Sequence, residues 1–173
     1  YIVRDILEKS GPGKAGRSPV EQKIGDYYAA CMDESAIEKA GTKPLDKYFQ
    51  AIAAVKTKED LAKEVVRLHR QGTNVLFGFG SGEDFKDSTQ VIGQVDQGGL
   101  GLPDRDYYFK EDAKSVELRK KYVEHVAKMF QLVGDSPEKS AAQAKAVMVI
   151  ETALAKNAFD PTTRRDPQKI YHK

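Results

Sequence analysis

The side chains of this chain best suited to metal chemistry are its three histidines, His69, His125 and His172. A helical zinc site of the hydrolytic type needs two histidines one turn apart with a glutamate between them, in the pattern His-Glu-x-x-His. Neither His69 nor His125 is followed by a second histidine at that spacing. The sequence therefore predicts that this chain alone forms no zinc site, and that its histidines lie on the surface or pack against neighbours.

Two further patterns resemble ligand sites without matching them. The glycines of residues 78–82 lack the Gly-Lys-Ser/Thr ending of a phosphate-binding loop, which favours a hairpin turn. The acidic residues of the middle of the chain do not fall in the twelve-residue calcium pattern, and we expect them to be solvated or to cap helices: Asp84, Asp87, Asp104, Asp106 and Glu111. Because no local Ser-His-acid signature occurs either, we predict no catalytic residue and no metal ligand, and substrate-binding residues remain unknown.

Cys31 is the only cysteine, so no disulfide can form within the chain. It follows Val20, Ile24 and Tyr27 at helical spacing, which places it on the apolar face of a predicted helix. Nothing near it in the sequence would lower the pKa of its thiol. We therefore expect Cys31 to be a core residue and not a nucleophile.

The composition is that of an ordinary globular protein, either one domain or part of one. Among 173 residues, 40% are hydrophobic, and 28 basic and 26 acidic residues are interspersed to give a formal charge of +2. Because no basic stripe stands out, nucleic acid is not an expected partner. No apolar run approaches the roughly 20 residues that a membrane-spanning helix needs.

The elements that would position these residues are mainly helices. Ser18, Pro19 and Glu21 form a capping box that begins one helix, and residues 44–55 carry the apolar spacing of another. Thr57 caps a third, which Gly72 ends.

The second half is predicted to contain one hairpin and two long helices. Residues 74–79 and 90–95 read as strands around the polar turn 81–88. A helix from about Ala113 to Val133 and another from Ser136-Pro137 to beyond Leu154 form an antiparallel pair, and a last helix starts at Asp166-Pro167. Close approach of the pair is assigned to the small side chains of Ala142, Ala146 and Ala153. The expected fold is mainly α, a multi-helix lobe with long antiparallel helices and one small β-hairpin.

Residues 97–108, with the sequence QGGLGLPDRDYY, form an ordered connector between the hairpin and the long helices. Glycines allow positive φ and close backbone approach, and Pro103 fixes φ. Arg105 with Asp106, and Arg164 with Arg165 and Asp166, are candidates for structural ion pairs beside a cleft. An arginine so placed could instead hold a peptide carboxylate.

Three stretches, in the same order, resemble motifs of the neprilysin and endothelin-converting-enzyme family of zinc endopeptidases. The first is residues 97–108, which is similar to Gly-Leu-Gly-Leu-Pro-x-Arg-Asp-Tyr-Tyr. The second, residues 28–37, resembles Tyr-x-x-Cys-x-(Asn/Asp)-Glu-Ser-x-Ile, and the third comprises Glu151, Ala153 and Leu154, residues 164–167 and Tyr171. The positions that carry the family signature, all expected to be structural, are Cys31, Glu34, Ser35, Gly99, Leu100, Gly101, Leu102, Pro103, Arg105, Asp106, Tyr107, Tyr108, Arg165, Asp166 and Pro167.

The resemblance implies that residues 1–173 are a partial amino-terminal helical lobe that encloses the substrate chamber of a longer zinc metalloendopeptidase. In that family a carboxy-terminal catalytic domain supplies two histidines and a glutamate to zinc, together with a catalytic glutamate, and none of these groups is expected here. The fragment alone is expected to be inactive and to bind no cofactor. Its partners would be that catalytic domain and peptide substrates, in an extracytoplasmic location.

Two alternatives remain open at this point. One is a self-standing helical binding module derived from the family, which the uncapped ends of the chain disfavour. The other is a small hydrolase in its own right, which would carry zinc at equal stoichiometry. In animal relatives the family uses a cysteine at the position of Cys31 in a disulfide, for which this chain offers no partner.

Overall fold

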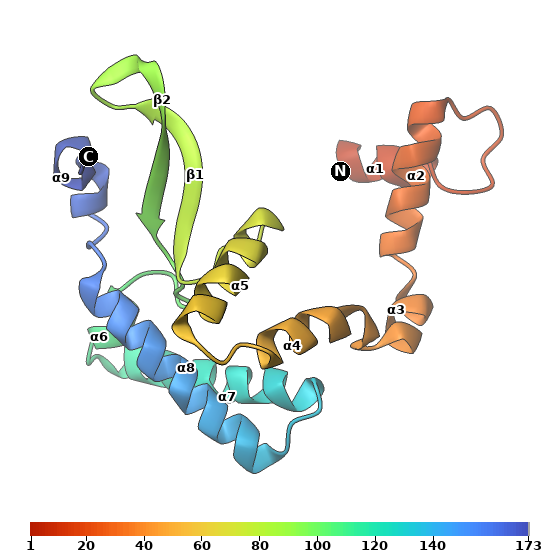
Figure 1. Cartoon of the computed structure of the whole chain (residues 1–173). Coiled ribbons are helices and arrows are strands. Elements are labelled where there is room, and N and C mark those ends of the chain that lie inside the picture. Colours follow the sequence, from red (N-terminus) through yellow and green to blue (C-terminus); the bar gives the residue numbers. More distant parts are fainter. Residues whose placement is uncertain (173) are drawn as a thin grey trace. The chain divides into compact units, whose positions relative to one another are not determined.

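The computed structural model describes residues 1–172, which are mainly helical with one two-stranded antiparallel sheet (Figure 1). The predicted fold class is therefore confirmed. Contacts divide the chain into two compact units, Tyr1–Ala53 and the residues from Ala54 onward.

The first unit is entirely helical. It contains α1 (Ile2–Lys9), α2 (Pro19–Cys31), α3 (Glu34–Ala40), a 3-10 turn η1 (Lys43–Leu45) and α4 (Asp46–Ala53). The predicted capping box is present, because Ser18 Oγ accepts a hydrogen bond from the Glu21 N–H and the Glu21 carboxylate accepts one from the Ser18 N–H. Buried Gly25 lets α2 approach the end of α1, since a Cβ there would lie 1.7 Å from the Ser10 carbonyl oxygen.

The apolar face predicted for α2 is exposed, contrary to expectation. The exposed fractions of Val20 and Tyr27 are 65% and 76%, and Cys31 is exposed as well. The period of the apolar residues predicted the helix correctly. It did not reveal whether another element of this chain covers that face.

The second unit begins with α5 (Lys58–Arg70), capped as predicted by Thr57. It ends in a Schellman motif, in which the Gly72 and Thr73 N–H groups donate to the carbonyls of His69 and Leu68 and Gly72 adopts φ 83°.

The hairpin follows as β1 (Phe77–Asp84) and β2 (Asp87–Gln97), with Phe77 paired to Gln97 and Glu83 to Val91. Its existence was predicted, but the strands run through the segment 81–88 that was assigned to the turn. Phe85 and Lys86 alone make the turn, with Asp84 Oδ1 accepting from the Lys86 N–H at 2.9 Å.

The long helices α7 (Ala113–Leu132) and α8 (Pro137–Asn157) pack against each other as predicted, with α6 (Asp106–Phe109) preceding them (Figure 1). The buried small residues of α8 are Ser140, Ala144 and Ala155. The expected alanines at 142, 146 and 153 are exposed instead, so that part of the prediction was wrong. After α8 come a 3-10 turn η2 (Thr163–Arg165) and the short helix α9 (Pro167–Ile170), which begins after Asp166 as predicted.

The core of this unit is small. It lies where residues 97–108, which we call the signature loop, meet α7 and α8. Leu102, Tyr108 and Ala155 are buried at its centre. Partly buried side chains surround them: Leu100, Tyr107, Leu118, Tyr122 and Met148. The loop that carries the family signature is thus built into the core.

Candidate functional site

His69 contacts the segment that leads into the hairpin. Nε2 of His69 lies 3.0 Å from the carbonyl oxygen and 3.3 Å from the backbone nitrogen of Val75, and its ring packs on Phe77 at 4.8 Å between centroids. This ring fixes the connection from α5 into β1. Within residues 1–172, no group of three or more His, Cys, Asp or Glu side chains is placed to hold a metal ion, so the residues present do not fit a zinc site.

A buried carboxylate, Glu151 of α8, organises the signature loop. Its Oε2 accepts hydrogen bonds from the Tyr108 hydroxyl at 2.6 Å and from the Gly101 N–H at 3.2 Å, while its Oε1 accepts one from the Tyr122 hydroxyl at 2.8 Å. The hydroxyl of Tyr108 in turn accepts from the Leu102 N–H at 3.1 Å. Three donors on one carboxylate satisfy a charge whose burial would otherwise be costly.

Both tyrosines of this network are held as neutral donors. Burial, reinforced by the hydrogen bond to Glu151, raises the pKa of Tyr108 to about 12. The same causes raise the pKa of Tyr122 above its ordinary value. Both hydroxyls therefore stay protonated at neutral pH and donate to the Glu151 carboxylate.

Two glycines of the loop are required by contact. A Cβ on Gly101 would lie 1.9 Å from the Tyr122 hydroxyl oxygen. Gly99 has φ 73°, and a Cβ on it would lie 2.7 Å from Cα of Leu76, which itself has a left-handed φ of 66°. The loop packs so closely on the start of the hairpin and on α7 that no side chain fits.

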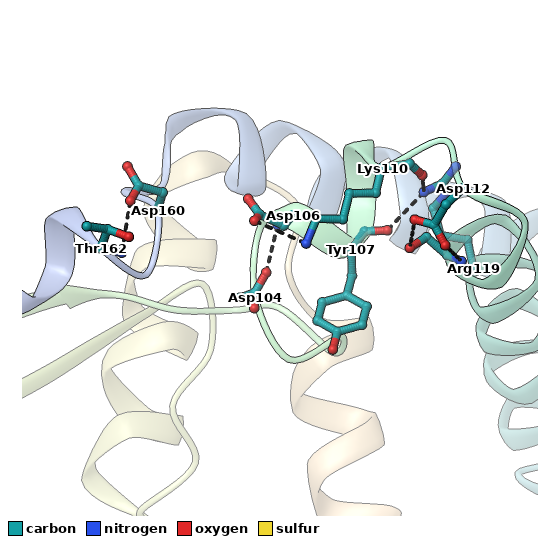
Figure 2. Close-up of polar contacts among 9 residues, drawn as sticks. Asp104, Asp106, Tyr107, Lys110, Asp112, Arg119, Asp160 and Thr162 are labelled. Carbon is teal, nitrogen blue, oxygen red and sulfur yellow. Dashed lines mark hydrogen bonds and ion pairs between the residues drawn. The ribbon is translucent and has the colours of Figure 1, made fainter.

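The expected ion pair between Arg105 and Asp106 does not form. Asp106 pairs with Lys110 at 3.5 Å, and its N–H donates to Asp104 Oδ1 at 2.8 Å (Figure 2). Nε of Arg105 is buried without a hydrogen-bond partner among the described residues, and its guanidinium lies 5.8 Å from the Phe109 ring centre. The one-turn spacing of Asp106 and Lys110 favours that pair over adjacent residues.

Arg119 of α7 is a loop-positioning residue that sequence reasoning missed. It donates to the carbonyl oxygens of Tyr107 at 3.0 Å and Lys110 at 2.6 Å and pairs with Glu111 at 3.2 Å, with its side chain only 17% exposed (Figure 2). Nothing in its local sequence distinguishes it from other helix-surface arginines. Glu151 did carry a signal, because it belongs to the third motif that resembles the family.

The segment after α8 docks on the end of β2. The Gln97 side-chain amide donates to the Phe159 carbonyl at 3.1 Å and accepts from the Phe159 N–H at 2.7 Å, and Arg164 pairs with Asp96 at 2.6 Å. Arg164 therefore does not pair with Asp166, as had been expected. Asp166 instead caps α9, accepting from the Gln168 N–H at 3.1 Å.

Four other signature residues are exposed, and one of them, Arg165, also lines the groove described below. Glu34 and Ser35 are exposed in the first turn of α3, which Asp33 caps. Arg165 is exposed, and Pro167 is the first residue of α9.

A groove of about 1090 Å³ lies in the second unit. Residues 92–99 form one side, Leu102, Pro103 and Asp104 of the signature loop line it, and residues 157–172 contribute the other side. The signature loop thus has one face in the core and another on this groove.

Comparison with known proteins decides the family. The model of the amino-terminal part of peptidase family M13 matches residues 1–173.

The chain belongs to peptidase family M13.

Its M13 relatives include neprilysin-3 of Drosophila melanogaster, 33% identical over 99% of this chain, and human endothelin-converting enzyme 1, also 33% identical over 99%. The M13 chain covers 23% of each of these relatives. Among solved structures, the zinc metalloprotease Zmp1 of Mycobacterium tuberculosis in complex with an inhibitor matches 96% of this chain with a TM-score of 0.83 and 36% identity, and 25% of Zmp1 is covered. Its open state gives the same TM-score, at 34% identity.

The M13 chain therefore spans about a quarter of the length of these relatives, at the amino-terminal end of the peptidase unit. The resemblance read from three short motifs is confirmed over the whole chain. No helix among the described residues is long and apolar enough to span a membrane.

Proposed function

We propose that this chain forms part of the wall of the substrate chamber in a zinc metalloendopeptidase that hydrolyses peptides. The observation that carries the proposal is the match to peptidase family M13 along the entire chain, with relatives named as metalloprotease and endothelin-converting enzyme. No such match points to the alternative of a self-standing binding module, which is not favoured.

The zinc and the catalytic groups belong, in this proposal, to a carboxy-terminal domain outside these 173 residues. Two observations support that division. His69 is engaged with the Val75 backbone, and the described residues offer no metal-ligand cluster. The contribution of this chain is then to shape and restrict access to the chamber, with its loop residues as scaffold.

The test is a pair of measurements on the purified 173-residue chain. We expect zinc well below equal stoichiometry by atomic absorption and no cleavage of an internally quenched peptide, whereas an enzyme that joins this chain to its catalytic domain cleaves the peptide and loses activity with a chelator. Equal-stoichiometry zinc together with chelator-sensitive cleavage by the 173 residues alone would refute the division of labour.

The chamber role has its own test in the joined enzyme. A short peptide should be cleaved, while the same sequence placed within a folded protein should resist. Equal cleavage of both would show that access is not restricted. The family resemblance also leads us to propose an extracytoplasmic location, which cell fractionation with an antibody to this chain checks.

A further inference from the structure

The outer edge of β2 lacks a strand partner in the part of the chain that the structure describes. The sheet has two strands in the order β1-β2, so each strand is paired on one side only. β2 is 11 residues long. A long unpaired edge exposes a row of backbone donors and acceptors, and natural proteins usually cover or disrupt such edges.

The groove runs along this edge. Residues 92–97 of β2 line it without interruption, and successive side chains of a strand point to opposite faces. An unbroken run of lining residues therefore means that the groove follows the backbone edge and not one face. None of the described lining residues belongs to β1, whereas Ile170 at the end of α9 lines the groove, and Figure 1 shows α9 next to β2.

The lining suits an extended, largely uncharged segment. Ile92, Leu100, Leu102 and Ile170 supply apolar surface. The charges of the arginine and carboxylate side chains that line the groove cancel, and Arg164 already pairs with Asp96. These side chains are Asp96, Asp104, Arg164 and Arg165. The volume of about 1090 Å³ exceeds the range of about 300 to 1,000 Å³ of ordinary small-molecule pockets and leaves room for several residues of chain.

We propose that a strand from the part of the peptidase outside this chain adds to the outer edge of β2 and makes the sheet three-stranded. The inference rests on the proposed function, because it needs the longer enzyme. The match to Zmp1 covers 26% of that relative, so the other 74% of such a chain is available to supply the strand. Charge balance in the groove favours this occupant over an acidic or basic substrate peptide, and main-chain pairing would supply the affinity.

Overlapping synthetic peptides that span the unmatched part of Zmp1 test the proposal on the full 173-residue chain. We expect one peptide, or two that overlap, to slow amide hydrogen exchange in β2 by about tenfold or more while β1 amides that are already paired change little. Ile92→Lys should abolish this protection. Val91→Lys is the matched control, because Val91 is 74% exposed in the same strand and does not line the groove.

Circular dichroism melting establishes whether Ile92→Lys remains folded, and Ile170→Lys on the opposite side of the groove serves if it does not. The proposal is overturned if no peptide protects β2, or if Ile92→Lys and Ile170→Lys bind as the unmodified chain does. Protection of β2 that appears with protein concentration alone would identify a second copy as the occupant and also overturn it. The zinc and cleavage assays above are independent of these measurements, so failure of the proposed function is recognised separately.

Discussion

Glu151 is the residue on which the signature loop depends. In Glu151→Gln, the amide oxygen can still accept, but its NH2 group faces hydroxyl and N–H donors. Because hydrogen bonds to a charged group contribute about 1.5–3 kcal/mol, we expect the free energy of unfolding to fall by about 2–3 kcal/mol. Urea denaturation measures it. Glu117→Gln, which removes only an exposed ion pair with Lys121, is the control and should cost about 0.5 kcal/mol or less.

Gly101 tests the close approach of the loop to α7. Gly101→Ala forces a Cβ against the Tyr122 hydroxyl, so we expect a loss of about 1–3 kcal/mol, the usual cost of overpacking. Tyr122→Phe removes the nearest clashing atom and leaves the ring carbon Cζ, 2.5 Å from the new Cβ, so it relieves the clash in part. The double variant should therefore be more stable than the sum of the two single losses predicts, by thermal unfolding.

Gly80→Ala is the control for this cycle, since no atom lies within 4 Å of a Cβ there. It should leave stability nearly unchanged. Strict additivity of Gly101→Ala and Tyr122→Phe would contradict the contact.

The raised pKa values of Tyr108 and Tyr122 predict instability in alkali. The pKa of tyrosine in the unfolded chain is about 10. A tyrosine whose pKa is higher in the folded chain stabilises the fold fully at pH values below that unfolded pKa. The contribution of Tyr108 is then lost as the pH rises from about 10 toward about 12. Urea midpoints across this window should fall in the unmodified chain and fall less in Tyr108→Phe; parallel curves would refute the assignment.

At the scale of elements, the helix starts were predictable because their causes are local. Each of three helices begins at a Ser or Thr whose side chain accepts a hydrogen bond from the backbone N–H three residues later: Ser18, Thr57 and Ser136. The ends of the strands could not be predicted in this way. The polar residue types of 81–88 favour a turn, whereas pairing across the hairpin extends both strands and leaves a turn of two residues.

The buried face of α8 was also out of reach of local reasoning. Alanine occurs on both the buried and the exposed face of helices. Ala142 and Ala146 therefore gave no indication that the buried face of α8 carries Ala144 and Ala155. For the candidate site, the glycines and tyrosines of the loop were recognised by type. Their common partner on α8 was not, since only the fold brings it near.

The two hydrogen bonds between the Gln97 side chain and the Phe159 backbone hold the segment after α8 against the end of β2. Gln97→Ala removes two hydrogen bonds to the Phe159 backbone, so exchange of the amides in residues 158–165 should quicken by about tenfold, with a stability loss of about 1 kcal/mol. Gln90→Ala, at an exposed position of the same strand, should have neither effect. Unchanged hydrogen exchange of the Phe159 amide would contradict a role for these two hydrogen bonds.

At the scale of the whole molecule, the division into two units predicts the pattern of limited proteolysis. Residues 54–57 connect α4 to α5, and Lys56 is exposed. Brief trypsin treatment should cut after Lys56 and leave a fragment beginning at Thr57 in which α7 and α8 remain intact, as mass spectrometry would show. Early cuts within α7 or α8 at the same rate would argue against separate units.

The carboxylate of Glu151 also constrains the order of folding. Gly101 and Glu151 are 50 positions apart, and α7 and the part of α8 before Glu151 lie between them. Their hydrogen bond can form only after that intervening chain has been brought together, at the entropic cost of closing a long loop. We therefore expect the most recognisable stretch of the sequence to reach its native conformation late in the folding of its unit.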